Sequence, residues 1–166
     1  SSDENKFTQA ADNFKMAIKT GKADLKTQAA VALADIYNRQ GKPEQALGQY
    51  NQIIKNDPDS GRMLFSRIAQ VYYKIGNYAE AKAFYTKSLE LAAPAQAGDI
   101  RFNLAEVFEA NSEQEAAIQQ YLLSAGLYAQ NTQLFARSLL RAAKLYEDKD
   151  NFKEALKIYK QIIEKN

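Results

Sequence analysis

Few residues in this chain could carry out chemistry. The 166 residues include no histidine and no cysteine, which excludes a Cys nucleophile, a Ser-His-Asp triad and a Cys/His zinc site. Acid–base work would fall to carboxylates, and the clearest pair is Glu106 and Glu109, three residues apart. On a helix they would lie one turn apart, but on an open surface with nothing to raise a pKa. We therefore predict that the protein is not an enzyme and binds no cofactor and no metal.

Composition and charge narrow the class of partner. Hydrophobic residues make up 46% of the chain and charged residues 25%, as in ordinary soluble globular domains. The formal net charge is only +2, and we predict no nucleic-acid partner because phosphate contacts need clustered Lys and Arg. No apolar run approaches the ~20 residues of a membrane span, so we expect no membrane insertion by this segment. The compartment stays open between cytoplasm and periplasm.

An internal repeat organises the sequence. The segments that start at Thr27 and Arg62 align without a gap. In this alignment the matching small and aromatic residues are Ala34, Tyr37, Gly41, Ala46 and Tyr50 with Ala69, Tyr72, Gly76, Ala81 and Tyr85. Weaker copies start at Gly98 and Ala136, and the first aromatics at 37, 72, 108 and 146 are 35, 36 and 38 residues apart. Self-similarity at such a period is typical of solenoid proteins.

Each copy has the pattern of two amphipathic helices. Between Phe65 and Ile75 the apolar residues recur at i, i+3, i+4 and i+7, which predicts a helix with one buried stripe. Gly76 suits the left-handed residue that ends such a helix. In the third and fourth copies the pairs Asn111-Ser112 and Asp150-Asn151 replace this glycine. We expect the aromatics at 37, 72, 85, 108, 121, 146 and 159 to lie in the core between stacked pairs.

This pattern resembles the tetratricopeptide repeat (TPR) family, and its irregular repeat spacing is similar to that of bacterial TPR scaffold proteins. The best copy, Arg62 to Ala93, has Phe65, Tyr72 and Gly76 in family positions. The resemblance implies an all-α fold, a right-handed α-α superhelix (solenoid) of antiparallel helix pairs with about nine helices. It implies one domain over 1–166, with an orphan second helix at 4–20 and repeats at 27–60, 62–95, 98–131 and 136–166.

The same resemblance implies a scaffold for protein–protein interaction, with a peptide or partner protein bound in a concave groove lined by the first helices. The candidate contacts at the groove-facing slots are Asn38, Arg39, Gln70, Tyr73, Lys74, Phe102, Glu106, Glu109, Arg137 and Lys144. Tyr73 and Phe102 are the most informative, because each lies outside the core stripe of its helix and aromatics dominate binding hot spots. The alternative is that both pad the junction between neighbouring repeats.

Self-association is a second functional hypothesis. The last helix carries an apolar stripe of Ala155, Ile158, Tyr159, Ile162 and Ile163. Repeat arrays need polar caps for solubility, and no polar capping helix follows this stripe. The chain would then be a structural module that self-associates through the uncapped ends of its array.

Overall fold

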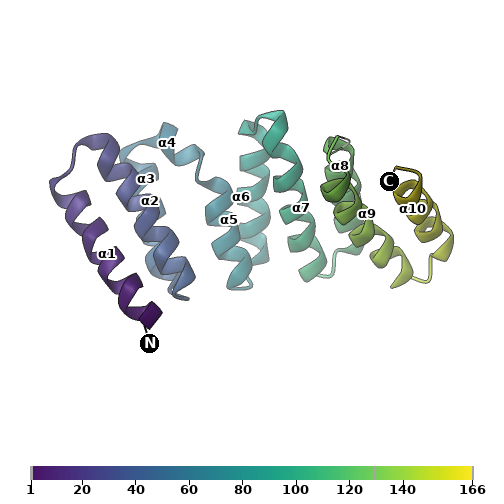
Figure 1. Cartoon of the computed structure of the whole chain (residues 1–166), viewed down its shortest axis with the longest axis horizontal. Coiled ribbons are helices and arrows are strands. Elements are labelled where there is room, and N and C mark those ends of the chain that lie inside the picture. The colour runs from purple at the N-terminus through teal and green to yellow at the C-terminus, as the bar shows by residue number, and fades with distance from the viewer. Residues whose placement is uncertain (1, 129, 166) are drawn as a thin grey trace. The chain divides into compact units, whose positions relative to one another are not determined.

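The protein is described by a computed structural model that covers residues 2–128 and 130–165, with side chains described outside 2–5, 23, 24 and 60. Every regular element in these residues is an α-helix, as predicted (Figure 1). The ten helices are α1 (Ser2–Thr20), α2 (Ala23–Arg39), α3 (Pro43–Asn56), α4 (Pro58–Arg62), α5 (Phe65–Lys74), α6 (Tyr78–Leu91), α7 (Pro94–Ala110), α8 (Gln114–Leu127), α9 (Thr132–Glu147) and α10 (Phe152–Lys165). They form two compact units, Ser1–Gly76 and Asn77–Asn166.

In the first unit the helices pack largely in the order in which they follow along the chain. Helix α1 packs on α2, α2 on α3, and α3 on both α4 and α5. Between α1 and α2 the core consists of Ala11, Leu33 and Ile36, with Phe7 and Phe14 packed against them. The first unit therefore has the sequential helix packing that the repeat pattern predicts.

The first helix of the predicted 62–95 repeat is preceded by an extra short helix. Helix α4 ends at Arg62 and α5 begins at Phe65, which brings the helices to ten where about nine were expected. This short helix packs closely on α3: a Cβ on Gly61 would lie 2.7 Å from the Cα of Ile54. Only glycine permits this approach without moving the backbone.

The second unit repeats the same arrangement over five helices. Helices α6 to α10 pack in sequence, each on the next. Their core cluster includes Ala105, Ala117, Ala142 and Ala143, all 0% exposed, beside the fully buried Tyr121. Small residues let the helices approach closely and the tyrosine ring fills the space beside them.

Four left-handed residues end the first helices. Gly41 and Gly76 have φ values of 69° and 76°, which confirms their predicted role. In the later copies Ser112 and Asp150 take this place, with φ values of 61° and 57°. The next amide then bonds back into the helix, as in Glu113 N to Phe108 O at 2.8 Å and Asn151 N to Tyr146 O at 2.8 Å. This is the six-to-one bond of a Schellman turn, formed here without glycine.

Six of the seven aromatics predicted to be structural are buried or pack against a hydrophobic core, and the seventh, Tyr72, is half-buried. Tyr85 and Tyr121 are 2% and 0% exposed. Tyr37 packs against the core of the first unit. In the second unit Phe108, Tyr146 and Tyr159 pack against the large cluster. Their spacing is therefore explained by packing.

Candidate partner-binding surface

Five of the predicted contact residues lie on α2 and α5 in the first unit, and we call them the α2–α5 patch: Asn38, Arg39, Gln70, Tyr73 and Lys74. Arg39, Gln70 and Lys74 are exposed, while Asn38 and Tyr73 are half-buried. The structure brings two of the five together, because Lys74 Nζ donates to Asn38 Oδ1 at 3.3 Å. The patch thus presents cationic, amide and aromatic groups.

A three-residue network joins α2, α3 and α5 in the same unit. Tyr50 OH donates to Asp35 Oδ1 at 2.5 Å, and Arg67 Nη1 donates to Asp35 Oδ2. Burial of the Tyr50 ring, followed by its hydrogen bond to Asp35, raises the pKa of Tyr50 well above its ordinary value. Tyr50 therefore stays a hydrogen-bond donor throughout the physiological pH range.

The other five predicted contacts lie on α7 and α9 in the second unit, and we call them the α7–α9 patch: Phe102, Glu106, Glu109, Arg137 and Lys144. Lys144 is exposed and pairs with Asp148 Oδ1 at 3.1 Å and with Glu147 Oε2 at 3.7 Å. Its hydrogen bond to Asp148 raises the pKa of Lys144, so the side chain carries its positive charge at neutral pH.

The prediction that Phe102 lies outside the core is wrong. Its side chain is 5% exposed and belongs to the main hydrophobic cluster. The ring packs edge-to-face on Tyr121 with centroids 5.1 Å apart, and the Arg137 guanidinium lies 4.0 Å above it. The helix pattern misses this burial because Tyr121 and Arg137 come from α8 and α9. A partner could reach Arg137 but not the ring beneath it.

Glu109 belongs to a network like that of Asp35. Its Oε2 accepts hydrogen bonds from Tyr121 OH and Arg141 Nη2, both at 2.8 Å. Arg141 was missed as a site residue, although a signal was present in the sequence. Arg67 and Arg141 are each the sixth residue of their copy, counted from Arg62 and Ala136.

Glu106 differs from Glu109 in its surroundings. It is half-buried, and among the described residues it accepts no hydrogen bond. Burial raises the pKa of Glu106 above its ordinary value, while the charges of Arg141 and Arg137 partly oppose the rise. The expectation that nothing raises a pKa at this pair is therefore wrong for Glu106, because its side chain is half-buried instead of lying on an open surface.

We predict that Glu106→Gln stabilises the protein in a pH-dependent way. The folded pKa of this carboxyl lies above the unfolded value of 4.5, so the unfolded state loses the proton first as pH rises. The wild type then loses stability relative to the Gln variant between 4.5 and the raised folded pKa, and the gap persists above it. Urea unfolding at about pH 4 and pH 7 measures this gap. An equal gap at the two pH values would contradict the assignment.

The predicted self-association stripe is partly buried. Ala155 and Ile158 are 2% and 6% exposed, because they face the core of the second unit. Ile163, Phe152 and Leu156 are 74%, 62% and 54% exposed, respectively. The exposed apolar surface of α10 is therefore centred on Phe152, Leu156 and Ile163, of which only Ile163 belongs to the predicted stripe.

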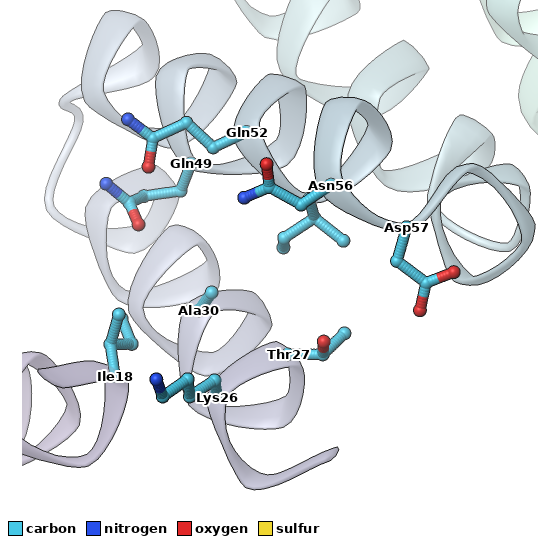
Figure 2. A pocket seen from close by; sticks show the side chains of 9 residues that line it. Ile18, Lys26, Thr27, Ala30, Gln49, Gln52, Asn56 and Asp57 are labelled. Atoms are coloured by element: carbon cyan, nitrogen blue, oxygen red, sulfur yellow. The ribbon is translucent and has the colours of Figure 1, made fainter. Parts of the chain in front are cut away.

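A surface pocket of about 450 Å³ lies in the first unit. Figure 2 shows the carboxamides of Gln49, Gln52 and Asn56 on α3, with Ile18 and Lys26 from α1 and α2 near them. Sequence reasoning missed this pocket because three helices contribute to it. The ionisable side chains of its lining are those of Lys26 and Asp57.

Among the described residues, no three acidic side chains lie close enough to hold a metal ion. Across residues 2–128 and 130–165, no helix is both long and apolar enough to cross a membrane.

Comparison with known proteins identifies the fold and a family. The family model described as soluble NSF attachment protein, SNAP, matches residues 1–166. No curated protein sequence matches the chain. The crystal structure of MamA superposes with a TM-score of 0.79 at 20% identity, covering 99% of this chain and 91% of that one.

Two other solved structures are similarly close. BtubC (BKLC) from P. vanneervenii has a TM-score of 0.82 at 15% identity, covering 99% of this chain and 74% of that one. The TPR-like repeats of a putative kinesin light chain from Podosopora anserina have a TM-score of 0.77 at 14% identity, covering 98% and 88%. At these identities the likeness shows the fold, a TPR-type helical solenoid, as the repeat pattern predicted.

Proposed function

The chain belongs to the soluble NSF attachment protein (SNAP) family, and on that premise we propose that it is a non-catalytic scaffold that binds a peptide or partner protein along its first helices. The family description names attachment to another protein, which supports a protein partner. The TPR-type fold supports the same class of function, because stacked helix pairs offer extended surfaces for recognition.

Glu106 is the observation that carries this proposal. A half-buried carboxylate without a hydrogen bond among the described residues costs stability, since its charge is partly removed from water. This carboxylate makes no hydrogen bond within the described residues, so a Lys or Arg of a partner could bond to it. Leu140 on α9 is 49% exposed and adds apolar contact area. An interaction site combines such an apolar contact with a few placed polar groups.

The geometry offers little support for catalysis. Glu106 has a raised pKa, but Glu109 beside it is already bonded to Tyr121 and Arg141. The 450 Å³ pocket lies in the other unit, and its lining includes three carboxamides and one carboxylate, that of Asp57. A general acid needs a second group and a bound substrate within reach. We therefore infer a binding role for the two patches.

The test is affinity capture from a lysate of the source cells, with the captured proteins identified by mass spectrometry. The bait is either the wild-type chain or the triple variant Tyr73→Ala, Lys74→Ala, Glu106→Gln, which alters both patches. We expect a partner that the wild type captures and the triple variant loses. Loss of an anchoring contact weakens binding by roughly tenfold or more. A partner that binds this weakly is removed from the bait during washing and is no longer detected.

A matched control separates the patches from general surface effects. Leu123→Ala, Glu90→Gln and Lys160→Ala change exposed residues of second helices and should leave capture intact. Both variants must keep the wild-type circular dichroism spectrum and must not melt at a lower temperature than the wild type. Equal capture by the wild type and the triple variant would show that binding does not use these patches.

A further inference from the structure

The charged side chains of α7 and α9 fall into two groups. Most of them form a hydrogen bond or an ion pair with another described residue: Asp99, Arg101, Glu109, Arg141, Lys144 and Glu147. Glu106 and Arg137 form neither with any described residue. A partner can therefore bond to these two charges without breaking a bond that the fold has already made.

Arg137 is a cation held in place by the ring beneath it. Its guanidinium lies 4.0 Å above the centroid of the Phe102 ring, and that ring is 5% exposed, whereas the Arg137 side chain is exposed. A guanidinium that lies over a ring keeps N–H donors at its edge, where they fit a planar acceptor such as a carboxylate. Arg137 is thus oriented for an anion that the described part of the chain does not supply.

Glu106 is an acid in the same situation, close to Arg137. Its half-buried carboxylate is partly removed from water, which costs free energy unless a cation or a donor replaces the water. Burial raises the pKa of Glu106, and the positive charges of Arg141 and Arg137 partly oppose the rise. Arg137 therefore lies within electrostatic range of Glu106, although the two side chains form no ion pair with each other.

The positions of these two charges along α7 set the spacing that a ligand must match. Phe102 and Glu106 are four residues apart (106 − 102), which is about 6 Å along a helix axis. Because Arg137 lies over Phe102, its charge is offset from that of Glu106 by about one helical turn. Alternate residues of an extended segment point to the same side about 6–7 Å apart. One extended segment can therefore reach both charges at once.

We propose that Arg137 and Glu106 recognise an extended segment of a partner protein that carries an acidic residue and a basic residue two positions apart. The acidic side chain binds the Arg137 guanidinium, and the basic side chain binds the Glu106 carboxylate. This inference rests on the proposed function and names the chemistry of the partner at the α7–α9 patch. A segment with only one of the two charges would cover the other charge of the patch without pairing it, which disfavours such a partner.

The test begins with a random peptide library displayed on phage and the full chain as bait. The library is first depleted on the double variant Glu106→Gln, Arg137→Gln, which removes peptides that bind elsewhere on the chain. We expect the peptides enriched on the wild type to share an acidic residue and a basic residue two positions apart.

The affinity of one selected peptide then assigns each contact. The peptide is synthesised with a fluorescent label, and its binding is followed by fluorescence anisotropy. We expect Glu106→Gln and Arg137→Gln each to weaken binding about tenfold. Replacing the acidic residue of the peptide by its amide should cost as much with the wild type but little with Arg137→Gln, because both changes remove the same bond. The basic residue of the peptide should be coupled to Glu106 in the same way.

Matched controls use charges on another helix and a conservative change. Lys160→Gln and Glu164→Gln alter exposed charges of α10 in the same way and should leave the affinity unchanged. Arg137→Lys keeps the charge but loses the planar donor group, so its affinity should lie between those of the wild type and Arg137→Gln. Each variant must keep the wild-type circular dichroism spectrum.

The proposal is overturned if no peptide is enriched, if the enriched peptides lack the acid–base pair, or if they bind the Glu106→Gln protein equally well. It is also overturned if a double-mutant cycle in urea unfolding shows that Glu106 and Arg137 stabilise each other, since the two would then already be partners within the chain. Any of these results, together with a partner that the triple variant fails to capture from the lysate, leaves the proposed function standing and removes this inference alone. Equal capture by both baits counts instead against the proposed function.

Discussion

Replacing Phe102 by alanine should lower the free energy of unfolding of the unit Asn77–Asn166 by about 3–5 kcal/mol. The ring is 5% exposed and packs edge-to-face on Tyr121. Its loss leaves a cavity between three helices, and the Arg137 guanidinium, 4.0 Å from the ring centroid, loses its cation–π contact. Urea unfolding followed by far-UV circular dichroism measures the change.

Leu140→Ala is the matched control for this prediction. Leu140 lies on α9 near Arg137 in sequence, but it is 49% exposed, so its truncation should cost less than about 1 kcal/mol. A small effect of Phe102→Ala on stability, with a large effect on partner capture, would contradict the structural role. It would restore the first interpretation of Phe102 as an anchor for a partner.

Replacing Ser124 by alanine should lower the free energy of unfolding of the same unit by about 1–3 kcal/mol. Ser124 and Ser138 are both 0% exposed. Ser124 Oγ donates to the carbonyl of Gly98 at 2.9 Å and lies 3.1 Å from Ser138 Oγ. Without it, the Ser138 hydroxyl stays buried and loses this partner. Thermal and urea unfolding of the single variant measure the cost.

The double variant Ser124→Ala, Ser138→Ala tests whether the two hydroxyls act together. Removing both members of a buried hydrogen-bonded pair costs less than the sum of the single losses, because no hydroxyl is left unsatisfied. We expect the double variant to be close in stability to Ser124→Ala alone. Fully additive losses would show that the Ser124–Ser138 bond contributes nothing measurable.

The helices and their ends were predictable because their causes are local. Phe65 to Ile75 contains its own apolar stripe, and Gly41 and Gly76 supply the left-handed turns without help from other helices. Ser112 and Asp150 were less specific signals. Each had a neighbouring residue, Asn111 or Asn151, that could equally have taken the positive φ.

The errors concern residues whose surroundings come from distant segments. Phe102 is covered by Arg137, 35 residues away (137 − 102), and no pattern within α7 contains that information. Gly61 allows α4 to pack closely on Ile54 of α3, a tertiary contact that the repeat pattern does not contain. The raised pKa of Glu106 depends on burial by a neighbouring helix. These features follow from packing, which a period within one helix does not specify.

The arginine networks also constrain how such an array can evolve. Arg67, in the copy that begins at Arg62, pairs with Asp35 of the preceding copy. Arg141, in the copy that begins at Ala136, pairs with Glu109 of the copy that begins at Gly98. The copy at Gly98 has Asn103 in the sixth place, so it brings no such cation. Duplication of the copy at Gly98 alone would therefore leave a carboxylate without its arginine, whereas this copy and the one at Ala136 could be inherited together as one unit.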